Sequence, residues 1–147
     1  MRWVVLYLTE EASVRDAASQ SAQTVAEILP TATLQGEYAD MIARLATKEW
    51  FTARISAAAL ISAAYPNLTT DQQRQHLDFF SRLCRDDTPM VRRVAAQHLG
   101  PMVRNVVEAS GRSALAEDGA VATLLIPLYE EHASTEQPVS TVALPMN

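Results

Sequence analysis

The feature of this sequence that most constrains its fold is an internal repeat. Three five-residue segments share an arginine in the second position and an alanine in the fifth: 14–18, 53–57 and 91–95. Their arginines lie 39 and 38 residues apart, and the apolar residues between them recur at spacings of three and four. Such a period is typical of stacked helix pairs. The sequence therefore predicts an all-α fold, built as an α-α superhelix of antiparallel helix pairs.

Turn and cap signals divide the repeated region into five predicted helices. Pro30 ends the first helix, because proline cannot continue the helical hydrogen-bond ladder. Thr70 with Gln73 predicts a capping box at the start of the fourth helix, and Pro89 suits the first turn of the fifth. A Gly-Pro pair at 100–101 predicts a kink in that fifth helix. Each predicted helix carries one apolar face, so neighbouring helices can pack side by side.

The sequence divides into three regions. Helical repeats are predicted over 1–107. An inserted surface loop is predicted over 108–120, where Gly111 and Gly119 interrupt the apolar period. A partial, degraded repeat and a tail follow over 121–147, because the next repeat has Thr141 where an arginine is expected, ten residues late. Terminal repeats of a solenoid normally carry polar outer faces, whereas both ends of this chain are expected to expose apolar surface. We therefore interpret the chain as a fragment or truncated product of a longer solenoid.

The repeated arginines predict contacts between neighbouring turns. Arg15, Arg54 and Arg92 are each preceded at five residues by an acid: Glu10, Glu49 and Asp87. These acids fall in the turn before the second helix of each pair, where the helix dipole favours negative charge. We predict that neighbouring turns exchange charge-assisted hydrogen bonds along the stack. The alternative is three separate solvated ion pairs, each worth less than about 1 kcal/mol.

Three longer strings carry a resemblance to a known family: EEASVRD at 10–16, KEWFTAR at 48–54 and CRDDTPMVRR at 84–93. They resemble consecutive inner turns of the HEAT-repeat scaffold (A) subunits of protein phosphatase 2A. The resemblance covers roughly residues 9–107 and matches the third to sixth repeats of that family. It implies that the repeats over 1–107 are HEAT-like and that the chain is a scaffold or regulatory segment of a phosphatase complex.

In that family the inner turns bind the exchangeable regulatory (B-type) subunits, whereas repeats near the far end hold the catalytic subunit. The resemblance therefore implies a set of contact positions: Glu10, Glu11, Trp50, Phe51, Thr52, Asp87, Thr88, Pro89, Met90 and Arg92. The adjacent rings of Trp50 and Phe51 support part of this set, because both cannot face inward on one helix. A hydrophobic staple at the helix entry is the alternative role for this pair. The catalytic subunit is not expected to bind this segment alone.

Composition limits the other partners and the compartment. With 12 basic against 17 acidic residues the chain has a net charge of −5, which favours neither nucleic acid nor an anionic membrane surface. Cys84 is the only cysteine, so no internal disulfide can form. We therefore expect a cytoplasmic or nuclear protein.

Residues suited to catalysis or metal binding are sparse. His76, His98 and His132 lie far apart in the sequence, and Cys84 falls on an apolar helix face, which favours structural roles. Some HEAT-like enzymes, the deoxyhypusine hydroxylases, hold iron with His-Glu dipeptides, and this sequence has only the reversed pair at 131–132. We expect no cofactor, no metal and no enzymatic activity. Another HEAT-repeat adaptor with a transport or kinase cargo is the nearer alternative, and a HEAT-like metal enzyme is the more distant one.

Overall fold

The computed structural model describes residues 11–135, and all the regular structure in that range is helical. The elements follow in the order α2 (Ala12–Ile28), α3 (Thr31–Thr33), η1 (Leu34–Tyr38, π-helical), α4 (Ala39–Ala46), α5 (Phe51–Ala64), η2 (Tyr65–Asn67, 3-10), α6 (Thr70–Cys84), α7 (Pro89–Gln97), α8 (Leu99–Ser110), η3 (Gly111–Leu115, 3-10), η4 (Val121–Leu125, π-helical) and α9 (Ile126–Thr135). The predicted all-α class is confirmed. None of the described helices is long and apolar enough to cross a lipid bilayer.

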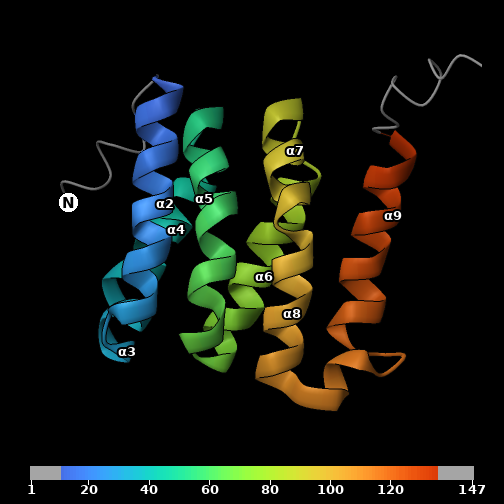
Figure 1. The fold of residues 1–147 in the computed structure, drawn as a ribbon. Coiled ribbons are helices and arrows are strands. Elements are labelled where there is room, and N and C mark those ends of the chain that lie inside the picture. Colours follow the sequence, from blue (N-terminus) through green and yellow to red (C-terminus); the bar gives the residue numbers. More distant parts are fainter. Residues whose placement is uncertain (1–10, 136–147) are drawn as a thin grey trace, which may run out of the picture.

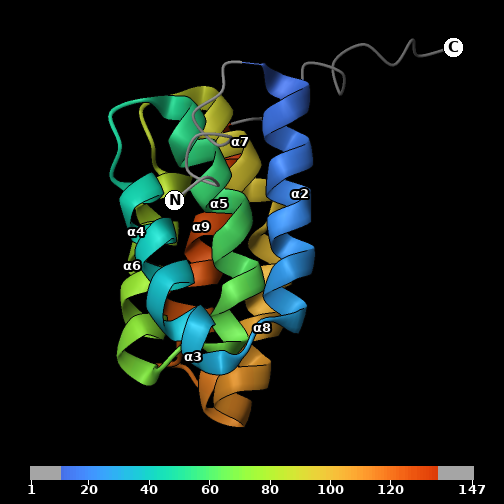
Figure 2. The same ribbon diagram turned by 90° about the vertical axis from the view of Figure 1, so that its left-hand side faces the viewer.

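The helices form two layers that repeat along one direction. One layer contains α2, α5 and the α7–α8 pair side by side, and the other contains α4 and α6 (Figures 1 and 2). Helix α5 packs against α2 and α7 in its own layer and against α4 and α6 in the other. Segment η4 packs against α8 and leads into α9, which continues the stack. This arrangement is the stacked helix-pair superhelix that the repeat period predicts.

The core lies between the two layers, and α5 is its centre. Ten of the fourteen residues of α5 are buried, most of them alanine, serine or isoleucine, so beyond its first turn this helix is largely enclosed. Small side chains on α5 allow α2 and α7 to approach closely from both sides. Larger side chains fill the space between the layers, and four of them are fully buried: Phe80, Ile42, Leu60 and Met102.

The capping box of α6 lies one residue earlier than predicted. The Thr69 hydroxyl accepts a hydrogen bond from the backbone N–H of Gln72 at 3.2 Å, and the Gln72 side chain accepts one from the N–H of Thr69 at 3.2 Å. The predicted pair, Thr70 with Gln73, has the same spacing and the same residue types. Sequence alone could not choose between them, because consecutive threonines and glutamines satisfy the motif in both registers.

The predicted kink near residue 100 is instead a break between two helices. Helix α7 ends at Gln97, and His98 adopts φ −95° and ψ 1° before α8 begins at Leu99. Pro101 then stands in the first turn of α8, where its missing N–H removes no intrahelical hydrogen bond. Ending one helix and starting another therefore accommodates this proline without loss of a bond.

The stretch predicted as a surface loop is shorter and more ordered than expected. Helix α8 extends to Ser110, and Gly111 ends it with φ 62°, a value that L side chains rarely adopt. The 3-10 turn η3 follows and buries Ala114 against the core. Gly119 lies directly against the backbone carbonyl groups of this turn, so only the residues around 116–119 remain irregular.

Candidate protein-binding ridge

Two short turns lie at the same edge of the structure. The turn at 47–50 connects α4 to α5, the turn at 85–88 connects α6 to α7, and α2 also begins at this edge (Figures 1 and 2). We call the edge formed by residues 11–15, 47–54 and 85–92 the inner-turn ridge. It contains the positions that the sequence predicts for protein contacts, except for Glu10, which lies outside the described residues.

Arg54 closes its own turn and reaches the next one. Its Nη1 donates hydrogen bonds to the backbone carbonyl oxygens of Lys48, at 2.9 Å, and Glu49. Its Nε donates to Asp86 Oδ2 at 2.7 Å, and its Nη2 donates to Asp86 Oδ1 at 3.0 Å and to the Thr88 hydroxyl at 3.3 Å. One guanidinium therefore joins the two turns through a bidentate ion pair.

The acid in this inter-turn pair is Asp86, which differs from the prediction of Asp87. Asp86 also accepts a hydrogen bond from the backbone N–H of Thr88 at 2.9 Å, which turns its carboxylate inward toward the preceding repeat. Asp87 is exposed, and its part in the geometry is its backbone carbonyl. An aspartate two residues before a threonine favours this local bond, so the DDTP string contained the signal that the five-residue spacing missed.

Of the other two repeated arginines, Arg92 repeats the bonds that Arg54 makes within its own turn, and Arg15 differs. Arg92 Nη1 donates to the backbone carbonyls of Asp86 at 2.7 Å and Asp87 at 3.2 Å, which closes its own turn as Arg54 closes the previous one. Arg15 is 6% exposed, and its Nε has no hydrogen-bond partner in the described part of the chain. Glu49, like Asp87, contributes a backbone carbonyl and not a side-chain ion pair among the described residues.

The environment of the pair keeps both groups charged. Burial acts to raise the pKa of the Asp86 carboxyl, but the hydrogen bonds from Arg54 and Thr88 together outweigh it and hold that pKa below its usual value. The hydrogen bond to Asp86 raises the pKa of Arg54 further above its already high value. Because only 17% of the Arg54 side chain and 11% of the Asp86 side chain are exposed, solvent screens this pair weakly.

Large apolar side chains stand exposed on both turns. Trp50 is 64% exposed, Phe51 43% and Met90 50%. They occupy the N-cap and first turn of α5 and the first turn of α7, where Ala53 and Val91 already fill the inward positions. The remaining predicted contact residues divide into exposed Glu11, Asp87 and Pro89 and half-buried Thr52, Thr88 and Arg92. The structure therefore brings the predicted contact residues that it describes to one edge.

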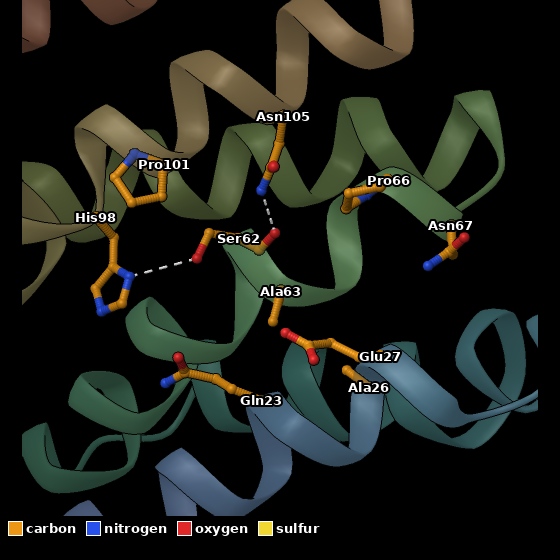
Figure 3. Close-up of a pocket in the computed structure, with 10 residues that line it drawn as sticks. All are labelled: Gln23, Ala26, Glu27, Ser62, Ala63, Pro66, Asn67, His98, Pro101 and Asn105. Carbon is orange, nitrogen blue, oxygen red and sulfur yellow. Dashed lines mark hydrogen bonds between the residues drawn. The ribbon is translucent and has the colours of Figure 1, made fainter.

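Outside the ridge, a groove of about 490 Å³ lies among α2, α5, η2 and α8. Figure 3 shows its ten lining residues, with the His98 Nδ1 and Ser62 Oγ atoms 3.3 Å apart and Asn105 bonded to the Ser62 carbonyl. These bonds join α5 to the α7–α8 pair. Burial lowers the pKa of His98, so at neutral pH its ring is uncharged.

The other predicted structural side chains are enclosed. His76 is 1% exposed on α6, and its Nδ1 lies 2.9 Å from the Gln72 carbonyl oxygen. Burial raises the pKa of the Cys84 thiol to about 12, so this cysteine is protonated at neutral pH. Among residues 11–135, no group of three or more histidine, cysteine or acidic side chains is arranged to hold a metal ion.

Proteins similar to this chain include regulatory and scaffold subunits of protein phosphatase 2A. No family model matches it. The probable serine/threonine-protein phosphatase PP2A regulatory subunit of Caenorhabditis elegans is 42% identical over 99 residues, which are 67% of this chain and 17% of that protein. The PP2A 65 kDa regulatory subunit of Drosophila melanogaster is 40% identical over 101 residues, 69% of this chain and 17% of that protein. The protein phosphatase 2A scaffold subunit of Dictyostelium discoideum is 33% identical over 109 residues, 74% and 19% of the two chains.

The chain thus spans less than a fifth of the length of these relatives. Their names are those of regulatory and scaffold subunits and not of a catalytic subunit, which agrees with the prediction that the chain is not an enzyme. The likeness covers two thirds or more of the chain, and the structure has the stacked helix pairs of a HEAT-repeat protein. The chain belongs to the HEAT-repeat family of protein phosphatase 2A scaffold (A) subunits.

Proposed function

We propose that this chain is a scaffold segment whose inner-turn ridge binds the regulatory (B-type) subunits of a protein phosphatase 2A complex. The observation that carries the proposal is the exposure of Trp50, Phe51 and Met90 on two adjacent turns of the same edge. Folding alone does not require three large apolar side chains to face solvent there. Exposed aromatic and methionine side chains grouped on one edge are typical of binding hot spots.

The Arg54–Asp86 pair supports this proposal because it fixes the two turns relative to one another. A bidentate pair holds both the distance and the angle between them, so Trp50 and Met90 are presented in a set geometry before any partner arrives. A partner then has less conformational freedom to remove on binding. Glu11 and Asp87 lie exposed on the same edge and give it a polar margin that favours correctly charged partners.

The proposal is tested by measuring the affinity of purified B-type regulatory subunits for the full chain and its variants. We expect Trp50→Ala and Met90→Ala each to weaken binding by about tenfold or more, since each truncates an exposed anchor. Ile28→Ala is the matched control, because Ile28 is 79% exposed at the opposite end of α2 from the ridge. Affinity that is unchanged in both ridge variants would favour a HEAT-repeat adaptor with another cargo.

The same proposal assigns no catalytic subunit to this chain alone. A pull-down with the full chain from a lysate should recover regulatory subunits, and recovery of the catalytic subunit without any regulatory subunit would contradict this part of the proposal. We also propose a cytoplasmic or nuclear location, because the regulatory subunits that it would bind must share its compartment. Fractionation of cells that express the chain tests this location directly.

A further inference from the structure

Arg54 shows what an arginine of the ridge can bind in the following turn. Arg54 takes a carboxylate from Asp86 and a hydroxyl from Thr88. One repeat earlier, the positions that correspond to Asp86 and Thr88 are Lys48 and Trp50, because the repeated arginines define a shift of 38 residues. Both acceptors are therefore replaced, one by an ammonium group and the other by an indole ring. We call this set, Arg15 with Lys48 and Trp50, the first rung.

Arg15 stands in the first rung as Arg54 stands in the second rung, which is Arg54 with Asp86 and Thr88. Helix α2 packs against α5 as α5 packs against α7. From this repeat relation we expect Arg15 to face the turn at 47–50, as Arg54 faces the turn at 85–88. Arg15 is 6% exposed, and its Nε, the atom that in Arg54 donates to the carboxylate, has no hydrogen-bond partner among residues 11–135. A buried guanidinium nitrogen without an acceptor is costly, because it has lost water and gained nothing in return.

The surroundings of the first rung favour an anion. Helices α2 and α5 both begin there, and neither has a side-chain cap or an acidic residue in its first turn. Their N-terminal dipoles add to the charges of Arg15 and Lys48. Glu11 and Glu49 lie nearby, but no ion pair joins either of them to Arg15 or Lys48 in the described structure, and the Glu11 carboxylate accepts from Ser13 at 3.3 Å.

We propose that the first rung is completed by the partner. An aspartate or glutamate side chain of the bound regulatory subunit takes the place that Asp86 takes in the second rung, accepts from the Arg15 guanidinium, and pairs with Lys48 beside the exposed ring of Trp50. This inference rests on the proposed function and adds the chemistry of the partner residue. It also explains why Lys48, which is exposed, stands in a turn position where the next repeat needs an acid.

Lys48 is the only lysine in the sequence, which makes a chemical test selective. A zero-length carbodiimide joins an amine directly to a carboxylate that is in contact with it. With the complex of the full chain and a purified B-type regulatory subunit, we expect mass spectrometry to identify an amide between Lys48 and one aspartate or glutamate of the partner. A complex that forms but crosslinks only through the N-terminal amine, or not at all, would overturn the proposal. Failure to crosslink together with dependence on a phosphorylated partner residue would overturn it in favour of a phosphate ligand.

A second experiment uses two readouts that must move in opposite directions. Lys48→Asp supplies the missing carboxylate within the chain, so we expect the melting temperature to rise by roughly 3–6 °C. The same change should weaken regulatory-subunit binding by about tenfold or more, because the partner's acid then meets an occupied and negative site. Arg74→Asp is the matched charge change on the exposed face of α6, and we expect it to leave both quantities unchanged.

These outcomes separate the first rung from the wider proposal. If Trp50→Ala and Met90→Ala weaken binding while Lys48→Asp does not, the ridge binds the partner but the first rung does not take its carboxylate. If the unmodified chain binds no regulatory subunit, both proposals fail together. A melting temperature that falls in Lys48→Asp would show that Arg15 does not face residue 48, which also overturns the inference.

Discussion

Replacing Asp86 with alanine tests whether the ridge is held by the second rung. The change removes the two carboxylate oxygens that accept from Arg54 at 2.7 and 3.0 Å. Arg54 keeps the carbonyls of its own turn and the Thr88 hydroxyl, so its charge is only partly compensated. The turn at 85–88 also loses the bond from the Thr88 N–H to the carboxylate. One substitution therefore loosens the contact between turns and the turn itself.

The expected cost follows from the burial of the pair. Hydrogen bonds to charged groups contribute about 1.5–3 kcal/mol, and breaking a buried ion pair costs about 3–5 kcal/mol. Because the side chains of Arg54 and Asp86 retain 17% and 11% exposure, we expect a loss near the lower end, about 2–3 kcal/mol. At roughly 3 °C per kcal/mol for a chain of this size, the melting temperature should fall by about 6–9 °C.

The assay is urea unfolding of Asp86→Ala, Arg54→Leu and the double variant, which gives the coupling energy between the two side chains. The comparison is Asp78→Ala, which breaks the Arg82–Asp78 pair on the exposed surface of α6. That pair has a similar N–O distance of 2.8 Å, but its side chains are 70% and 56% exposed, so the expected loss is only about 0.3–0.5 kcal/mol. Equal losses at the two sites would refute the argument that burial makes the second rung strong.

The same pair predicts a pH dependence with a definite sign. The pKa of the Asp86 carboxyl is lowered in the folded chain, so the folded state favours the ionised form. Its contribution is complete above the unfolded pKa, about 3.9, and is lost as the pH falls through the lower folded value. The difference in unfolding free energy between the natural chain and Asp86→Asn should therefore be largest near neutral pH and shrink below about pH 4. A difference that is constant with pH would contradict the assignment.

Three further predictions concern the fold. Thr69→Ala should cost about 1 kcal/mol in urea unfolding, and Thr70→Ala only a few tenths, because Thr69 caps α6. Gly119→Ala should destabilise the fold strongly in the same assay, since a Cβ there would collide with backbone carbonyl groups. Gly36 lies in a helical segment with open space around it, so Gly36→Ala should be neutral or stabilising by about 0.5–1 kcal/mol. Cys84 should react with a thiol reagent at pH 8 only as fast as the chain unfolds, because burial raises its pKa to about 12, and fast labelling of the folded chain would contradict its burial.

The repeat period was sufficient to predict the stacked pairs and the shared edge. A period near 40 with three- and four-residue apolar spacing has few solutions other than stacked helices, and two adjacent rings at 50–51 cannot both be buried at the start of one helix. These two rings are accordingly exposed, Trp50 at 64% and Phe51 at 43%. These features depend on composition summed over many residues, so an error of one position does not change them.

Features that depend on the position of a single residue were harder to predict from the sequence. The capping box and the inter-turn acid were each displaced by one position, from Thr70 to Thr69 and from Asp87 to Asp86. Neighbouring residues of the same type make both registers equally good in sequence, and only tertiary contacts select one. The break at His98 has a similar origin, because a Gly-Pro pair allows either a bent helix or a new start.

The two rungs of the ridge illustrate how a solenoid can use one position for two purposes. Where the next turn supplies the acid, as at Asp86, the arginine donates hydrogen bonds to that turn, and these bonds fix the two turns relative to one another. Where that position holds Lys48, the arginine is left with an unused donor, and a carboxylate from another protein is the group that would satisfy it. If the first rung takes a partner carboxylate as proposed, one turn position strengthens the stack when it holds an acid and selects the partner when it does not. A substitution that restores the acid should strengthen the stack at the expense of the partner, and no change confined to the exposed face of α6 can reproduce that reciprocal effect.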